Sequence, residues 1–249
     1  MRKKLVLAFL AVCALAHAQN EVTLVAPGGI RAAIEQLIPG FEAKTGIKVK
    51  ATFGSGGGTK QQVIKGDVFD VPVVQPPYQP VLESGNVVTS TGRPLATVAV
   101  GAAVRKGAPK PDISTPEGIK KTLLAAKSIT YPNPAGGAAA GVTFDQALKK
   151  LGIAEQVEPR LKRAQGGAAA MKMTADGEAE IGFTFMSEME EPGLDIVGPL
   201  PREVATPTEL SGFVSSKAKN PKAAQALLDY LSSPAAAPIY KANGMVASH

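Results

Sequence analysis

Four glycine-rich segments carry the residue types in this chain that are best suited to chemistry. They are Pro27-Gly28-Gly29, Ser55-Gly56-Gly57-Gly58, residues 135–140 and residues 165–170. Each lies at or just before the start of a predicted helix, where the first backbone N–H groups lack intrahelical acceptors and form the positive end of the helix dipole. A small anion accepts hydrogen bonds from such groups, and glycine leaves the approach open because it has no Cβ. The pattern therefore predicts anion binding.

The number of these turns matters more than any one of them. A single glycine turn between a strand and a helix often serves packing alone, whereas four such turns predict a shared cleft. A hydrogen bond to a charged group contributes about 1.5–3 kcal/mol, and micromolar binding requires about 8 kcal/mol. About five or six well-aimed donors therefore suffice for tight recognition.

The remaining inventory argues against several other kinds of site. Cys13 is the only cysteine, and the two histidines are His17 and the last residue, His249. Ser–His and Cys–His catalysis and thiolate or histidine metal centres are therefore not expected. Residues 55–60 also lack the Gly-Lys-Ser/Thr order of a nucleotide-phosphate loop. We expect no cofactor and no metal site.

The N-terminus has the features of a cleaved export signal. Basic residues at positions 2–4 precede an apolar run from Leu5 to Leu15, and Ala16-His17-Ala18 follows with the small-x-small pattern of a cleavage site. The apolar run has about ten residues, too few to span a bilayer, which takes about twenty. We therefore expect a signal peptide at residues 1–18 and a mature chain in the periplasm.

Removal of this leader also changes the charge balance. The whole chain has 27 Lys and Arg against 21 Asp and Glu, a net charge of +6. Without Arg2, Lys3 and Lys4 the balance is 24 against 21, or +3. The mature chain is therefore not expected to bind nucleic acid.

Short β-rich runs alternate with helical stretches, which predicts α/β architecture with helices on mainly parallel sheets. The expected strands cover residues 22–26, 47–53, 71–74, 95–104, 128–131, 181–185, 195–197 and 210–215. The expected helices cover residues 30–44, 59–65, 139–151, 168–175, 221–231 and 235–242, with two more around Val81 and from Thr115.

Two β-rich segments, near residues 96–101 and 206–212, are predicted to cross between two lobes. Residues 19–97 and 209–249 would then form the first lobe, and residues 98–208 the second. Each lobe would contribute two of the four glycine turns. Ligands of open α/β sheets bind at the carboxyl ends of strands, so the expected site is the cleft between the lobes.

In the order of its motifs the chain resembles the periplasmic molybdate-binding proteins of ABC importers and their divergent solute-binding relatives. The resemblance covers nearly the whole mature chain. It is carried by Gly28-Gly29, Thr52 to Gly57, Lys65-Gly66, Asp70-Val71, Ala99 to Ala103, Ala140-Gly141, Ala147-Leu148, Leu151-Gly152, Glu178 to Phe183 and Ser232 to Ala236. It implies the two-lobed type II periplasmic binding protein fold with two linking strands, an anion held between helix N-termini, and delivery to an inner-membrane ABC permease.

The resemblance also assigns roles to single positions. The first ligand serine of the molybdate-binding proteins falls on Gly29, the second on Ser55 or Gly56, and their tyrosine on Phe185. Their backbone donors fall near Ala140 and Gly166. Two hydroxyl donors are thus missing, so the expected ligand is a molybdate-like oxyanion or a small organic carboxylate.

From the turns and the resemblance together we assign ligand binding to Gly28, Gly29, Ile30, Arg31, Ser55, Gly56, Gly57, Ala140, Gly166 and Phe185. Arg31 could hold a carboxylate through two parallel hydrogen bonds; the alternative is a solvated helix residue. The acidic residues Glu188, Glu190 and Glu191 are expected to form a solvated loop.

The leading interpretation is a monomeric binding protein without enzymatic activity. The alternative is an isomerase of a small tricarboxylic acid, since some proteins that resemble this family isomerise such acids. That reaction needs a general base, for which Glu188, Asp70, a lysine or a tyrosine is available. A scavenging or signalling receptor without a permease is a third interpretation.

Overall fold

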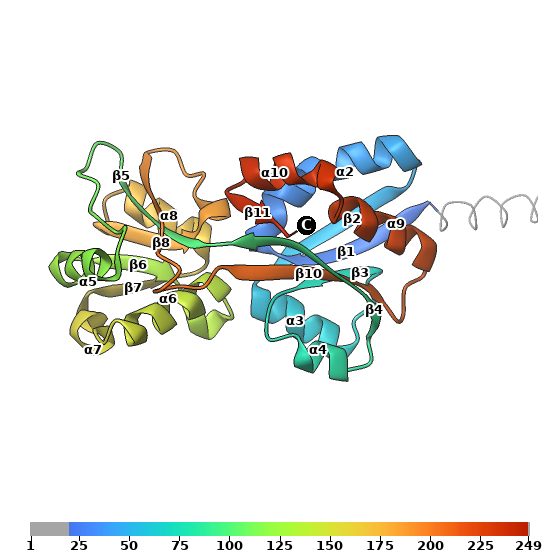
Figure 1. Ribbon diagram of the computed structural model, residues 1–249, viewed down its shortest axis with the longest axis horizontal. Helices are drawn as coiled ribbons and strands as arrows, with labels where there is room; N and C mark the ends of the chain where they lie inside the picture. The colour runs from blue at the N-terminus through green and yellow to red at the C-terminus, as the bar shows by residue number, and fades with distance from the viewer. Residues whose placement is uncertain (1–19, 249) are drawn as a thin grey trace, which may run out of the picture.

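The computed structural model describes residues 20–248. They form two lobes, each a sheet covered by helices, with two extended segments running between them (Figure 1). The predicted signal peptide lies outside the described residues. Within residues 20–248, no helix is both long and apolar enough to cross a membrane.

The first lobe is built from both ends of the chain. Its sheet has the strand order β11-β4-β10-β3-β1-β2. The strands are β1 (Glu21–Pro27), β2 (Lys48–Gly54), β3 (Val71–Val74), β4 (Val87–Val98), β10 (Thr208–Ser215) and β11 (Met245–Ala247). The helices are α2 (Arg31–Thr45), α3 (Gly56–Lys65), α4 (Gln79–Glu83), α9 (Pro221–Leu231) and α10 (Ala237–Ala242).

The second lobe is built from the middle of the chain. Its sheet has the strand order β7-β6-β8-β5-β9. The strands are β5 (Val100–Arg105), β6 (Ile129–Pro132), β7 (Leu161–Ala164), β8 (Ile181–Phe185) and β9 (Leu194–Pro199). The helices are α5 (Pro116–Ala125), α6 (Ala139–Lys150), α7 (Ala154–Val157) and α8 (Gly167–Ala175).

The two sheets share one arrangement of parallel strands. β1 lies between β2 and β3, and β6 lies between β7 and β8, all parallel. The added strands β4, β5, β9, β10 and β11 run antiparallel to their neighbours. The expected parallel pairing therefore holds for the strands that lead into the glycine turns, while the linking strands make both sheets mixed.

The chain crosses between the sheets twice. β4 ends at Val98 and β5 begins at Val100, so one extended segment belongs to both sheets. The return path runs from Pro199, at the end of β9, to Thr208, at the start of β10 (Figure 1). Both crossings fall in or beside the segments that the sequence singled out. The division into lobes at 97/98 and 208/209 stays a prediction.

Some elements differ from the sequence-based expectation. α3 begins at Gly56 and not at Thr59, because Ser55 Oγ accepts a hydrogen bond from the Gly58 N–H at 3.1 Å and caps a glycine-rich first turn. β7 was not expected: Lys162 and Arg163 in its centre are exposed and hide its strand character. β11 has three residues, too few for a recognisable pattern.

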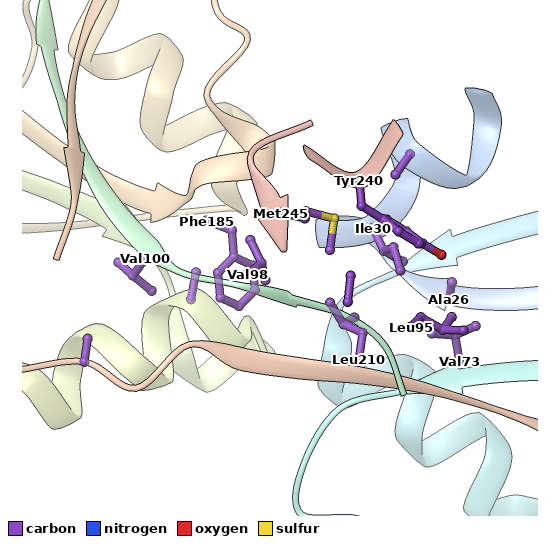
Figure 2. Close-up of a cluster of buried hydrophobic side chains, with 14 of the residues drawn as sticks. Ala26, Ile30, Val73, Leu95, Val98, Val100, Phe185, Leu210, Tyr240 and Met245 are labelled. Carbon is purple, nitrogen blue, oxygen red and sulfur yellow. The ribbon is translucent and has the colours of Figure 1, made fainter. Parts of the chain in front are cut away.

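One hydrophobic core extends through both lobes. In Figure 2 its side chains follow the first crossing from Leu95 through Val98 to Val100, all at most 2% exposed. Phe185 at the end of β8 and Met245 of β11 belong to the same core. The first crossing is therefore packed on both sides of the interlobe boundary.

Asp70 ties the parallel strands of the first lobe to the start of α9. Its Oδ2 accepts hydrogen bonds from Thr23 N at 2.8 Å and Thr23 Oγ1 at 2.7 Å. Its Oδ1 accepts from Lys219 N at 2.7 Å. Asp70 is 2% exposed and precedes β3, whereas the glycine turns follow the strands. It has a structural role and is not available as a general base.

Asp70→Ala is expected to lower the free energy of unfolding by about 3 kcal/mol, because buried donors lose a charged acceptor. Urea denaturation measures this change. The exposed neighbour Asp67 provides the control, since Asp67→Ala should change stability by less than about 0.5 kcal/mol. Equal effects of the two substitutions would contradict the assigned role of Asp70.

Candidate functional site

A cavity of about 700 Å³ lies between the lobes, where the parallel strands end. The first lobe lines it with Pro27, Gly28, Gly29, Arg31, Ala32, Gly54, Ser55, Gly56 and Gln75. The second lobe lines it with Pro132, Asn133, Gly136, Ala138, Ala139, Ala140, Ala164, Gln165, Gly166, Gly167, Ala168, Phe185, Ser187, Glu188, Glu190 and Glu191. All four glycine turns thus contribute to one site.

The turns occupy equivalent places in the two lobes. In each sheet one turn follows the central parallel strand, β1 or β6, and the other follows the neighbouring strand, β2 or β7. Helices α3, α6 and α8 begin at the cavity with Gly56, Ala139 and Gly167. Their first N–H groups have no acceptor within the helix. The arrangement thus brings the positive ends of helices from both lobes to one space.

Two of the assigned residues lie elsewhere. Ile30 is 1% exposed and belongs to the hydrophobic core, as Figure 2 shows. Gly57 does not line the cavity, and its N–H donates to Gly137 O across the lobes at 2.9 Å. Neither is therefore placed to bind a ligand in the cavity. The spacing of residues along the chain predicted where both turns lie. It does not show which residues of a turn face the cavity.

The contact between Gly57 and Gly137 requires two residues without side chains. A Cβ at Gly57 would lie 3.0 Å from the Cα of Gly137, which is closer than side-chain carbons normally approach. Gly137 also has a φ of +77°, in the left-handed region that favours glycine. A second interlobe bond joins Ser187 Oγ to Gly29 O at 2.6 Å. These contacts hold the lobes together around the cavity.

Phe185 and Gly29 occupy one shared space. A Cβ at Gly29 would lie 2.9 Å from Cδ2 of the Phe185 ring, and this ring is 4% exposed. A serine at position 29 would therefore collide with the ring unless the ring moved. The absence of a serine at position 29 and the absence of a tyrosine at position 185 are thus linked, because the ring of Phe185 fills the space that a side chain at position 29 would need.

Gln75 is a site residue that the sequence analysis missed. It directly follows β3, and its side-chain amide lies against Gly56. Gln75 is 6% exposed, and its Oε1 has no hydrogen-bond partner among the described residues. Gln75 follows β3, the third parallel strand of the first lobe, just as Phe185 ends β8, the third parallel strand of the second. This equivalent position in the two lobes is the sequence feature that could have predicted Gln75 as a site residue.

Arg31 is the only lysine or arginine among the described residues of the cavity wall. Its guanidinium carbon lies 5.0 Å from the ring centroid of Phe53, within the range of a cation–π contact. Within residues 20–248, the ion pairs found involve other residues, and no carboxylate lies within 4 Å of the Arg31 side-chain nitrogens. Arg31 is exposed, as expected for a solvated helix residue, and its role in ligand binding stays a prediction.

The acidic segment is only partly a solvated loop. Glu190 is exposed, as expected, but Glu188 lies on the cavity wall and is partly buried. Thr184 Oγ1 donates a hydrogen bond to Glu188 Oε2 at 2.6 Å. Burial raises the pKa of the Glu188 carboxyl, against the opposing effect of this bond. The described residues contain no group of three or more side chains suited to a metal ion.

Ser187→Ala is expected to favour separation of the lobes, because it removes a hydrogen bond that joins them. A net loss of about 1 kcal/mol changes the ratio of closed to open molecules about fivefold. Small-angle X-ray scattering should then show a larger radius of gyration. Ser216 Oγ donates to Gly85 O within the first lobe, so Ser216→Ala is the matched control. An unchanged radius in both variants would exclude the interlobe role of Ser187.

Comparison with known proteins places this architecture in a family. Residues 22–246 match the family described as bacterial extracellular solute-binding protein. The chain is 33% identical to the aconitate isomerase of a Pseudomonas species, over 90% of this chain and 87% of that protein. It is 32% identical to the molybdate-binding protein ModA of Azotobacter vinelandii, over 94% and 92% of the two chains.

The fold is also that of solved binding proteins. The structure of the periplasmic molybdate-binding protein of Azotobacter vinelandii superposes with a TM-score of 0.74 at 22% identity, over 90% of this chain and 98% of that one. The two-lobed periplasmic binding protein fold predicted from the sequence is thereby confirmed. The chain belongs to the bacterial extracellular solute-binding proteins.

Proposed function

We propose that this protein is the substrate-binding component of an ABC importer and that its ligand is a small organic anion with more than one carboxylate. The observation that carries the ligand class is the unpaired guanidinium of Arg31 in a cavity lined by glycine turns. A guanidinium matches the two oxygens of a carboxylate through parallel hydrogen bonds.

The wall argues against a small tetrahedral oxyanion. Gly29 and Phe185 supply no hydroxyl groups, and the ring of Phe185 fills the space that a side chain at position 29 would need. A site that lacks such donors loses discrimination for the ligand that uses them. The cavity of about 700 Å³ also lies in the usual range for organic ligands, about 300–1,000 Å³.

The helix N-termini provide places for further carboxylates. Gly56 starts α3 in the first lobe, and Gly167 starts α8 in the second. An organic acid with carboxylates at both ends can accept hydrogen bonds from both lobes at once, which favours closure. Closure would bring the ligand under the interlobe contacts made by Gly57 and Ser187.

Location and partners follow from the same proposal. The basic and apolar segment at residues 2–18 supports export to the periplasm. We infer that the closed, loaded protein acts as a monomer and delivers its ligand to an inner-membrane permease.

Arg31→Lys is expected to weaken binding of citrate or tricarballylate by about tenfold or more, because a lysine cannot form the paired hydrogen bonds. Thermal shift assays provide the first screen, since a ligand at a hundred times its Kd stabilises by about 2.7 kcal/mol. Isothermal titration then gives the affinities. Arg93 is exposed on β4 and does not line the cavity, so Arg93→Lys serves as the control.

Molybdate and sulfate are the comparison ligands in this screen. Protection by these ions, with none by di- or tricarboxylates, would overturn the proposed ligand class. Protection by carboxylates that is equal in wild type and Arg31→Lys would remove Arg31 from the binding site.

Isomerisation of a tricarboxylic acid is a second candidate function, which Glu188 favours. This carboxyl lies on the cavity wall, its pKa is raised by burial, and the relative from Pseudomonas carries the name aconitate isomerase. In an allylic shift, Glu188 would take a proton from the methylene carbon and return it to the far carbon of the double bond. The double bond moves, the composition is unchanged, and no cofactor is needed.

This second candidate predicts that wild type converts trans-aconitate to cis-aconitate and that Glu188→Gln does not, because an amide cannot accept the proton. Proton NMR in D₂O follows both isomers and the exchange of the methylene protons. Binding of trans-aconitate without conversion or exchange would restrict the protein to transport. Conversion by Glu188→Gln at the wild-type rate would exclude Glu188 as the base.

A further inference from the structure

We propose that Glu188 shares one proton with the bound anion, so that this side chain makes ligand capture depend on proton uptake. The inference rests on the proposed binding of an organic anion in the interlobe cavity. It does not depend on isomerisation. What prompts it is the composition of the cavity wall, which holds three glutamates and one arginine although helix N-termini converge there.

The Glu188 carboxylate lies where the anion is expected to bind. Glu188 ends a short 3-10 turn, Met186–Glu188, that follows β8. A Cβ at Gly28 would lie 3.8 Å from Glu188 Oε1, and a Cβ at Gly167 would touch Oε2. The carboxylate is therefore positioned between a glycine turn of the first lobe and the N-terminus of α8 in the second.

The ionised carboxylate of Glu188 only accepts hydrogen bonds, so it has no proton to donate to a ligand. Thr184 is fully buried and donates its hydroxyl proton to Oε2 at 2.6 Å. The backbone N–H of Phe185 also lowers the pKa of this carboxyl. A ligand carboxylate brought beside it would then face a second carboxylate with no proton between them, and such pairs do not both stay ionised.

No basic side chain of the neighbouring described elements neutralises Glu188. Arg31 of α2 shares the cavity but makes no ion pair with it. Lys172 of α8 pairs with Asp176 at 2.8 Å, and Arg105 of β5 lies beside Gly177. Glu190 and Glu191 on the same wall add negative charge. Burial therefore raises the pKa of Glu188 without opposition from a cation.

The sign of the linkage follows. The pKa of Glu188 is already raised in the ligand-free protein, and a bound anion raises it further. At a pH between the pKa of Glu188 in the free protein and its higher pKa in the complex, binding of the anion takes up a proton. The affinity for the anion therefore falls as the pH rises. For one proton the limiting slope is about tenfold in Kd per pH unit. Anion capture should therefore strengthen when the surroundings become more acidic.

Tricarballylate is a suitable probe, because it carries three carboxylates but neither a hydroxyl group nor a double bond. Isothermal titration over a pH series above the last ionisation of tricarballylate, in buffers of different ionisation enthalpy, reports both Kd and the protons taken up. Wild type should lose affinity toward higher pH, by up to about tenfold per unit, and take up as much as one proton per ligand. Glu188→Gln should bind with no pH dependence and should exceed wild type at the highest pH.

Two further variants secure the interpretation. Glu190→Gln changes an exposed acid of the same wall and should keep the wild-type slope. Thr184→Val removes a hydrogen bond that lowers the pKa of Glu188, so it should move the pH-dependent range upward. Circular dichroism and thermal unfolding establish that each variant is folded.

The possible failures are distinct. Tricarballylate binding that is independent of pH in wild type, or equally pH-dependent in Glu188→Gln, would overturn the proton-sharing role and leave the proposed ligand class intact. Failure of wild type to bind tricarballylate at every pH would overturn the ligand class and this inference with it.

Discussion

The site depends on how closely two glycine backbones approach each other. Gly57 of the first lobe donates to Gly137 O of the second at 2.9 Å, and a Cβ on either residue would press against the opposite backbone. This contact joins the two walls of the cavity, since the neighbouring residues Gly56 and Gly136 line it. The helix N-termini can act on one ligand because this distance is short enough for both lobes to reach it.

The cavity wall lacks two of the expected hydroxyl donors and carries a guanidinium and a partly buried carboxyl. Gly29 and Phe185 remove hydroxyl donors in a coupled way, since one leaves the space that the other fills. Arg31 adds a guanidinium, and Glu188 adds a carboxyl whose pKa is raised by burial. Both side chains line the cavity, and their roles in ligand binding and proton uptake are the proposals made above.

The sequence predicted those parts of the site that follow from local pattern. Strand, glycine turn and helix recur in the chain, and turns that end parallel strands must meet at one edge of a sheet. Gly28, Ser55, Ala140 and Gly166 were assigned from these turns together with the family resemblance; all four line the cavity, and their role in ligand binding stays a prediction. Ser187 was not assigned to the site, because its bond to Gly29 O depends on how the two lobes face each other. Gln75 and Glu188 were missed although each follows a strand that pairs with the central parallel strand of its lobe, because no glycine turn marks either position. Ile30 and Gly57 were assigned from spacing alone, which does not show that Ile30 belongs to the core or that the Gly57 N–H donates to Gly137 O.

The two crossings between the lobes are very unequal in length. Only Ala99 separates β4 from β5, and its carbonyl accepts a hydrogen bond from Met186 N at 2.9 Å, whereas residues 200–207 separate β9 from β10. β11 pairs with Ala96, Thr97 and Val98 and so stiffens the first crossing up to its last residue. The longer connection is packed as well, because Leu200, Val204 and Ala205 are at most 5% exposed and Leu200 N donates a hydrogen bond to Val100 O at 2.8 Å. We therefore expect any rotation of one lobe against the other to be absorbed by the few backbone dihedral angles around Ala99.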